Sequence, residues 1–344
     1  MSSIISIIVS VLVFGIVIFI HEFGHFIVAK KSGIKVNEFS IGMGPRIFGV
    51  QKGETNYSLR ALPIGGFVAM EGEDEESDAD GAFNKAPVAN RIAVVFAGAV
   101  MNLLLGFAVL IFMVSQQDAI TSKTVSMFYG NAMTQQTGLQ VDDEIIAVNG
   151  RRCYIANDII YEFAFTQDGK LDFTVRRDGK IVELEDVTFE TYTDDNGMQQ
   201  LVLDFYVYPA EKTVVSVVRE AINWTISYAR MIFMSLVDML TGNVAINQVS
   251  GPVGIVSAIG EATSIGLTSV LNLLALITIN LGVFNLVPFP ALDGGRLVFL
   301  LIELFRGKPI NPKYEIWVNT AGMLVLLAFM ALVTFSDITR LIGF

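Results

Sequence analysis

The sequence predicts a polytopic α-helical membrane protein with about four transmembrane helices, membrane-associated β-hairpins and a small inserted β-rich domain. Hydrophobic residues make up 53% of the 344 positions, more than in an average soluble domain. Four segments are apolar over about 20 residues, the length that a helix needs to cross a bilayer. About 90 residues between the second and third segments instead have a soluble composition, which indicates a separate folded domain.

Charge and cysteine content exclude several classes of protein. A net charge of −11 argues against a nucleic-acid partner, because a protein that binds phosphates needs a basic surface. The single cysteine, Cys153, excludes an internal disulfide and a cysteine-based zinc site. The residues Met1 to Ser3 lack the positive charge that begins a cleaved signal peptide, so we expect the first apolar segment to remain in the mature chain.

The first apolar segment, about residues 4–29, contains the stretch HEFGH near its end. On a helix, His21 and His25 lie on one face and Glu22 lies on the adjoining flank. This is the H-E-x-x-H pattern, in which two histidines bind zinc and the glutamate acts as general base. The alternative is that the histidines only pack in a helix bundle. They are the only two histidines of the chain, and ionisable residues inside a membrane span are costly, so the metal interpretation is favoured.

Basic residues set the expected orientation of the spans. Lys30 and Lys31 follow the first segment, and Arg91 begins the second, at about residues 91–114. Because lysine and arginine flank spans preferentially in the cytoplasm, these ends are expected inside the cell and the N-terminus outside. The third and fourth segments, about residues 267–287 and 316–335, are separated by a linker that is also basic, so the C-terminus is expected outside as well. The basic residues of that linker are Arg306, Lys308 and Lys313.

Short β-prone pieces broken by glycine and proline occupy residues 32–72, which predicts one or two hairpins. The acidic run 71–80 that follows is interpreted as a solvated loop. In the second apolar segment, Gly98 and Asn102 lie four residues apart on one helix face. Two interpretations stay open for this pair, namely close helix packing with a hydrogen bond across the interface, or a role near the metal.

Residues 121–210 show alternating strand patterns with turn signals, and are expected as a small β-rich domain on the outer side of the membrane. Residues 214–240 are apolar but interrupted by charges, so a helix in the membrane interface is favoured over a span. A Gly-Pro-Val-Gly stretch at 251–254 is expected to break this helix. The chain therefore divides into a first half of the membrane core (1–120), the inserted domain (121–210), an interfacial helix region (211–260) and a second half of the core (261–344).

The stretch NLVPFPALDGGR, residues 285–296, is the second feature with chemical meaning. Pro288 and Pro290 remove backbone donors and Gly294 permits tight bends, so the backbone opens near membrane depth. A catalytic zinc usually has three protein ligands, and with both histidines used the third must be a carboxylate. Asp293 is the candidate, with capping of a loop or helix as the alternative. Zinc would lower the pKa of a bound water to about 7 and Glu22 would accept its proton, which indicates peptide-bond hydrolysis.

Five stretches together resemble the site-2 protease family, closest to the bacterial regulator-of-sigma-E protease type. They are HEFGH, NLVPFPALDGG, FSIGMGPRI, ALPIGGFVAMEGE and GLQVDDEIIAVNG. The resemblance implies a zinc-dependent intramembrane endopeptidase of the plasma membrane, acting on single-span proteins such as an anti-sigma factor or signal-peptide remnants. It implies His21, His25 and Asp293 as zinc ligands, Glu22 as catalytic base, and Asn285 as a residue that engages the substrate backbone. Asn102, Gly65 and Gly66 are further candidates for substrate binding, since the hairpins of 32–72 would receive substrate as an added strand.

The inserted domain resembles a single PDZ domain, with one departure. Asp142 stands where a glycine normally precedes Asp143. Such a domain would filter substrates by the size of their outer part, and a peptide-binding groove is the alternative.

Two functions other than proteolysis are less consistent with the sequence. A non-catalytic membrane chaperone or binding protein of the same fold would need metal ligands but no base, so the intact Glu22 argues against it. A zinc transporter is disfavoured because the sequence shows one metal-ligand cluster and no string of ligands along a path.

Overall fold

The computed structural model describes residues 3–342 except 74, 76, 164, 165, 167, 194–198 and 243–248. The chain separates into two compact units, the first made of Met1–Val109 and Met231–Phe344 and the second of Leu110–Arg230. The second unit is wider than the predicted range 121–210, because the flanking helices pack with its strands. Their shared buried cluster contains Val114, Ile120 and Val217.

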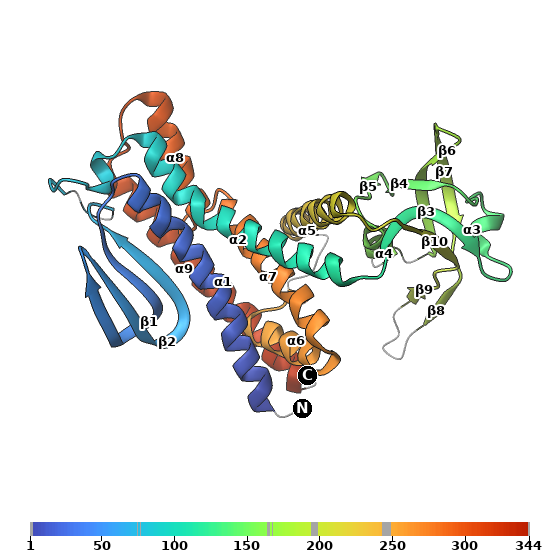
Figure 1. The fold of residues 1–344 in the computed structure, drawn as a ribbon, viewed down its shortest axis with the longest axis horizontal. Helices are drawn as coiled ribbons and strands as arrows, with labels where there is room; N and C mark the ends of the chain where they lie inside the picture. The colour runs from blue at the N-terminus through green and yellow to red at the C-terminus, as the bar shows by residue number, and fades with distance from the viewer. Residues whose placement is uncertain are drawn as a thin grey trace. The chain divides into compact units, whose positions relative to one another are not determined.

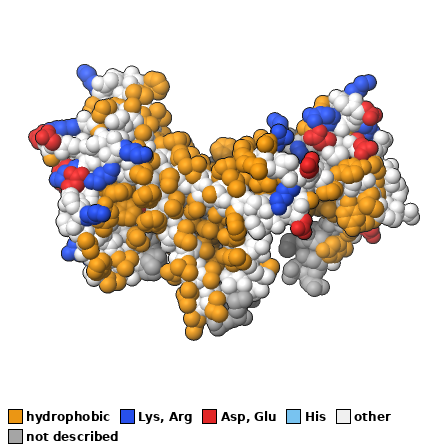
Figure 2. All heavy atoms as spheres, in the orientation of Figure 1, with side chains coloured by type: hydrophobic (Ala, Val, Ile, Leu, Met, Phe, Trp, Pro, Cys, Tyr) orange, Lys and Arg blue, Asp and Glu red, His pale blue; other side chains and the backbone are white. Residues whose placement is uncertain are grey.

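Unit 1 consists mainly of helices (Figure 1). Four helices among the described residues are long and apolar enough to cross a membrane, as predicted, and no more than 44% of any of their most apolar windows is buried inside the protein. Figure 2 shows hydrophobic side chains spread over the visible face of these helices, a surface suited to lipid. The chain is therefore a multi-pass membrane protein. The four candidate spans lie in α1 (Ser3–Lys31), α2 (Val88–Gln116), α7 (Leu267–Leu286) and α9 (Pro312–Ile342). Unit 1 also contains the shorter helices α6 (Pro252–Ile265) and α8 (Asp293–Arg306), and a 3₁₀ turn at Phe83–Lys85 before α2.

Glycines allow the helices of unit 1 to approach closely. A Cβ atom on Gly24 of α1 would lie 2.5 Å from the carbonyl oxygen of Ala97 in α2. A Cβ on Gly282 of α7 would similarly lie 3.0 Å from the carbonyl of Ala99. Small residues at such crossings are the usual means by which membrane helices pack, so α2 is fixed between α1 and α7.

A helix over residues 214–240 and a break at 251–254 were predicted, but no second helix after the break. The structure instead has α5 (Val214–Thr241) and a separate α6 that begins at Pro252. Proline is well tolerated at the first position of a helix, so the Gly-Pro stretch starts a helix here as well as separating it from α5. Asp337 of α9 accepts hydrogen bonds from the backbone N–H groups of Gly251 (3.2 Å) and Gly254 (2.8 Å), which caps the positive end of α6.

Strands β1 (Val36–Lys52) and β2 (Thr55–Met70) form one antiparallel, strongly curled hairpin. Phe39 pairs with both Tyr57 and Val68, so the first part of β1 lies between the two ends of β2. Residues 66–70 pair on one side with β1, and none of the other described strands pairs with their opposite side. These residues are therefore an edge strand, and we refer to residues 66–70 as the edge segment.

Unit 2 contains a six-stranded sheet of order β10-β3-β4-β6-β7, with β5 paired to β4. The predicted β-rich domain is therefore confirmed. Its core includes Cys153, and burial raises the pKa of this thiol to about 12, so it is not nucleophilic at neutral pH. The strands are β3 (Ile120–Phe128), β4 (Glu144–Val148), β5 (Arg151–Arg152), β6 (Lys170–Arg177), β7 (Lys180–Thr188), β8 (Thr191–Thr193), β9 (Gln199–Leu201) and β10 (Phe205–Ala210), and the short helices are α3 (Met133–Gln136) and α4 (Asn157–Phe163).

The loop that contains Asp142 keeps a glycine-like backbone without a glycine. Asp142 has φ +72°, a left-handed conformation in which aspartate is more common than most residues. The next residue, Asp143, is fully buried and accepts two hydrogen bonds of 2.7 Å from the guanidinium of Arg177. It also accepts a 2.8 Å bond from the N–H of Gln140, so one carboxylate holds the whole loop.

We expect Asp143→Asn to destabilise unit 2 by about 3 kcal/mol, because it removes a fully buried carboxylate that pairs with the half-buried guanidinium of Arg177. Urea-dependent proteolysis of the purified protein in detergent, read on fragments of residues 110–230, measures the change. Asp178→Asn, in the exposed turn beside Arg177, is the matched control. Equal resistance of the two variants would contradict this role.

Candidate metal centre

Three side-chain atoms from two helices converge in unit 1. The Nε2 atoms of His21 and His25 are 3.1 Å apart. Oδ2 of Asp293, at the start of α8, lies 3.2 Å from the first nitrogen and 3.4 Å from the second. Among the described residues these three form a group able to hold a metal ion. The structure thus brings together the three ligands predicted from the sequence.

The spacing of these atoms matches a zinc site. Zinc binds imidazole nitrogen at about 2.0–2.1 Å, and a tetrahedron with such bonds has edges of about 3.3–3.4 Å. All three observed separations are close to that edge length. Oδ2 of Asp293 is also buried with no hydrogen-bond partner, and a bound cation would satisfy this oxygen. The residues present therefore fit zinc.

Hydrogen bonds at the other ring nitrogens orient the two imidazoles. Nδ1 of His25 lies 2.8 Å from the carbonyl oxygen of Val94, so Nδ1 donates and Nε2 keeps its lone pair for a metal. Nδ1 of His21 lies 3.3 Å from the side-chain amide of Asn102, whose Oδ1 is otherwise buried without a partner. Because the amide oxygen and nitrogen are interchangeable in placement, Oδ1 is best assigned as the acceptor from His21. Asn102 thus contacts a predicted metal ligand, which favours the interpretation that it acts near the metal.

The close packing of α1 and α2 extends to the histidines. A Cβ atom on Gly98 would overlap Nε2 of His25 and would lie 2.8 Å from Cε1 of His21. Any side chain at this position would therefore displace the imidazoles. The sequence indicated Gly98 by its spacing from Asn102, with close helix packing or a role near the metal as alternatives. Gly98 lies at a close helix contact, and both residues adjoin the imidazoles.

Irregular backbone brings Asp293 to the histidines. After α7 the chain turns through Ala291, which has φ +72° and donates its N–H to Oδ1 of Asn319 in α9 at 3.3 Å. Gly294 and Gly295 follow, and a Cβ on Gly295 would lie 2.5 Å from the carbonyl oxygen of Phe289. The N-cap residue of α8 is Leu292, so Asp293 is the first residue inside the helix rather than its N-cap. The capping alternative for Asp293 is therefore not supported.

A cavity of about 180 Å³ adjoins the three ligand atoms, and we call it the site cavity. Glu22 lines it, as does most of the edge segment. A Cβ on Gly66 would lie 3.0 Å from Cγ of Glu22, so the edge segment passes directly beside the predicted base. The described lining residues are His21, Glu22, His25, Gly66, Phe67, Val68, Met70, Glu73, Val95, Asp293 and Arg296.

The other predicted substrate residues have different positions. Gly65 has φ +78° and faces the side chain of Met43, and Asn285 is buried in α7. Neither lines the site cavity.

Two parts of the site were missed from the sequence. Glu73 belongs to the acidic run interpreted as a solvated loop, yet its side chain is only 12% exposed because it pairs with Arg296 beside the site cavity. The loop interpretation is therefore wrong for Glu73. The carbonyl of Val94 is the second missed group, and a backbone acceptor inside an apolar helix leaves no signal in the sequence.

Two imidazoles and a carboxylate that converge beside a glutamate, inside a bundle of membrane-spanning helices, define a membrane zinc metalloprotease. A comparison with protein families agrees with this class. The chain belongs to peptidase family M50, whose family model matches residues 9–329.

Relatives cover nearly the whole chain. A Clostridium perfringens protein that bears the name of a zinc metalloprotease is 36% identical over 333 residues, covering 96% of this chain and 98% of the relative. The regulator of sigma-W protease RasP of Bacillus subtilis is 30% identical over 419 residues, with 98% and 99% covered. The zinc metalloprotease RasP of Bacillus licheniformis is also 30% identical, over 422 residues, with 98% and 99% covered. Zinc is thus the metal of the family.

We expect Gly98→Ala to lower zinc affinity by about 10–100-fold, because the added methyl group pushes both imidazoles out of position. Metal analysis of the purified protein in detergent measures the loss. Gly15→Ala, in the same span as the histidines, is the control, since a Cβ at Gly15 would meet nothing within 4 Å. Zinc content equal to that of Gly15→Ala would show that Gly98 does not position the ligands.

Proposed function

We propose that the chain is a zinc-dependent intramembrane endopeptidase that cuts transmembrane segments of single-span membrane proteins. The observation that carries this proposal is the placement of Glu22 and an edge strand on one cavity beside three zinc-ligand atoms. Metal binding alone requires no acid next to the ligands, so Glu22 in this position supports catalysis over the non-catalytic alternative.

His21, His25 and Asp293 would hold the ion. When bound, zinc supplies a water whose pKa is lowered to about 7 and polarises the scissile carbonyl. Glu22 then accepts the proton of the attacking water on its carboxylate and passes it to the leaving amine. The apolar helices around the site limit access of bulk water, which strengthens each of these electrostatic effects.

The edge segment supports a membrane-spanning substrate. A transmembrane helix hides its peptide bonds in its own hydrogen bonds, so it must become extended before it can be cut. An edge strand presents unpaired backbone donors and acceptors to which an extended chain can add. Because Gly66 lies against Glu22, a chain added there would place a peptide bond close to the base.

Orientation and physiological substrate extend the proposal. Gly260 of α6 approaches Ser6 near the start of α1, and Asp337 near the end of α9 caps the same helix, so the start of α1 and the end of α9 lie at one end of unit 1. With Lys30, Lys31 and Arg91 at the opposite end, we propose that both termini are on the outer side of the plasma membrane.

The Bacillus subtilis relative is named a regulator of sigma-W protease, which supports an anti-sigma factor as substrate, with signal-peptide remnants as a second class.

We propose a PDZ-like fold for the β-rich domain, placed outside the cell and filtering substrates by size. The left-handed Asp142 supports this assignment, because it gives the loop the conformation that a glycine provides in such domains.

Glu22→Gln should lower cleavage of a single-span reporter by at least about 100-fold while zinc content stays near one per chain, because the base is removed and the ligands are kept. His25→Ala is the control and should lose both zinc and activity. Cleavage is measured on purified protein in detergent or in vesicles. Turnover near that of the unmodified protein would refute the assignment of Glu22 as base, and absence of cleavage by the unmodified protein would refute the proposed function.

Asp293→Asn should weaken zinc binding, because an amide oxygen lacks the charge that helps to neutralise the ion. Asp293→Glu keeps the charge but moves the carboxylate by about one methylene, against a metal–oxygen distance of roughly 2.0–2.2 Å. We therefore expect the Glu variant to keep more zinc than the Asn variant and still to be impaired in cleavage. Metal analysis and reporter cleavage of the two variants test this. Unchanged zinc in both would exclude Asp293 as a ligand.

A further inference from the structure

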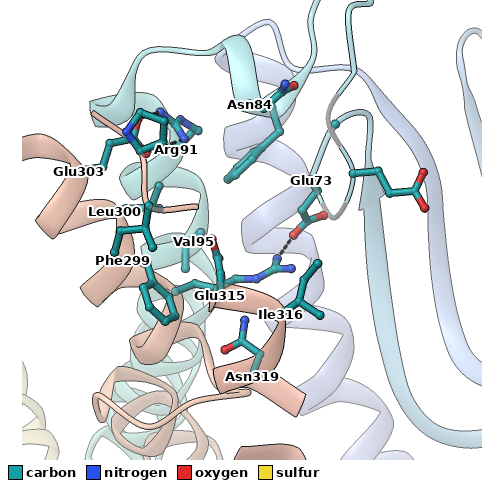
Figure 3. Close-up of a pocket in the computed structure, with 16 residues that line it drawn as sticks. Glu73, Asn84, Arg91, Val95, Phe299, Leu300, Glu303, Glu315, Ile316 and Asn319 are labelled. Atoms are coloured by element: carbon teal, nitrogen blue, oxygen red, sulfur yellow. Dashed lines mark hydrogen bonds and ion pairs between the residues drawn. The ribbon is translucent and has the colours of Figure 1, made fainter. Parts of the chain in front are cut away.

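Unit 1 contains a second cavity, of about 270 Å³. The residues that line it are drawn in Figure 3. Its walls come from the loop after β2 and from α2, α8 and α9. Three residues, Glu73, Val95 and Arg296, line both cavities. The two spaces are therefore neighbours that share one wall.

An ion pair forms the polar part of this shared wall. Oε1 of Glu73 accepts a hydrogen bond from Nη1 of Arg296, drawn as a dashed line in Figure 3. Oε2 of Glu73 lies 3.4 Å from the backbone N–H of Met70, the last residue of the edge segment. Arg296 follows Asp293 by one helical turn in α8. The pair thus connects the edge segment to the helix that carries the third zinc ligand.

The edge segment points from the base toward this pair. Gly66 lies against Glu22, and Met70 lies beside Glu73. Four residue steps of a strand span about 13 Å, at about 3.3 Å per residue. A chain extended along the edge segment would therefore leave the site cavity at the Glu73–Arg296 pair and enter the second cavity.

The second cavity opens at the end of unit 1 where basic residues flank the helices. Arg91 lies at the start of α2, and Glu303 and Glu315 lie near the end of α8 and the start of α9. Four carboxylates, those of Glu73, Glu75, Glu303 and Glu315, and the two guanidinium groups of Arg91 and Arg296 line the cavity. Arg91 donates hydrogen bonds to Glu303 and Arg296 donates one to Glu73, so the described lining keeps two more negative than positive charges. Single-span proteins carry an excess of lysine and arginine on their cytoplasmic flank, so this wall is complementary to that flank.

We propose that the second cavity binds the cytoplasmic flank of the substrate, as an extended basic polypeptide that passes the Glu73–Arg296 pair. This inference rests on the proposed function and adds a binding site to it. The Glu73–Arg296 pair separates to admit the chain and re-forms when the product leaves. Substrates are then selected by the sequence that follows the membrane segment as well as by the segment itself.

Disulfide trapping tests the path of the chain directly. In the Glu22→Gln background, which holds substrate uncut, Phe299→Cys places a thiol on the wall of the second cavity. Val298→Cys is the matched control, because Val298 is the preceding residue of α8, is 37% exposed and lines neither cavity. Single cysteines are placed at successive positions of the cytoplasmic flank of a reporter. The native Cys153 is buried, and the background without an added cysteine reports any reaction at it.

We expect cross-links from Phe299→Cys to a short window of flank positions, and much weaker ones from Val298→Cys. Equal cross-linking of the two variants, or none from Phe299→Cys to a reporter that co-purifies with the protein, would overturn the proposal. Cleavage by the protein with Glu22 intact is measured in parallel. If that protein cuts the reporter but the flank does not reach Phe299→Cys, the second cavity is not a substrate site, whereas absence of cleavage refutes the proposed function itself.

A charge test gives an independent readout. Glu315→Gln should raise KM for a reporter with a basic flank by roughly fivefold, the effect of about one partly exposed ion pair, with kcat unchanged. It should leave KM unchanged for a reporter whose flank lysines and arginines are replaced by serine. Glu261→Gln, an exposed glutamate of α6, is the matched control. The same KM change for both reporters would show that Glu315 does not recognise flank charge.

Discussion

The convergence of two imidazoles and one carboxylate within 3.4 Å of each other is the constraint on which the rest of unit 1 depends. A carboxylate between membrane-spanning helices is costly unless a cation neutralises it, so the three ligand atoms must lie close enough to share one ion. Two features bring the ligand atoms together. Glycines at the contact of α1 with α2 leave room for the imidazoles, and the irregular backbone before α8 turns the chain so that Asp293 reaches them.

Local signals in the sequence were sufficient for the main elements and ligands. Helical spacing places His21 and His25 on one face, and hydropathy defines the four spans, because both depend on neighbouring residues only. The third ligand had to be a carboxylate because the chain has no other histidine and its one cysteine lies outside the spans, and Asp293 was the acidic residue in broken backbone at the end of a span. The β-rich domain followed from its alternating pattern and its turn signals.

Features that depend on tertiary packing were not predictable. Helix α6 is short and follows a Gly-Pro stretch, and contacts with α1 and α9 rather than its own pattern stabilise it. Glu73 resembles its acidic neighbours in sequence and differs only because Arg296, more than two hundred residues later, lies beside it. The contact of Val94 with His25 involves the backbone, which every residue possesses.

The separation of the ligands along the chain also orders the biogenesis of the enzyme. His21 and His25 enter the membrane with α1, whereas Asp293 is synthesised only after the β-rich domain and α7 are complete. Until α8 folds back onto α1, the nascent chain holds two imidazoles and a glutamate but no complete ligand set. The proposed zinc site is therefore complete only after the two halves of unit 1 have assembled.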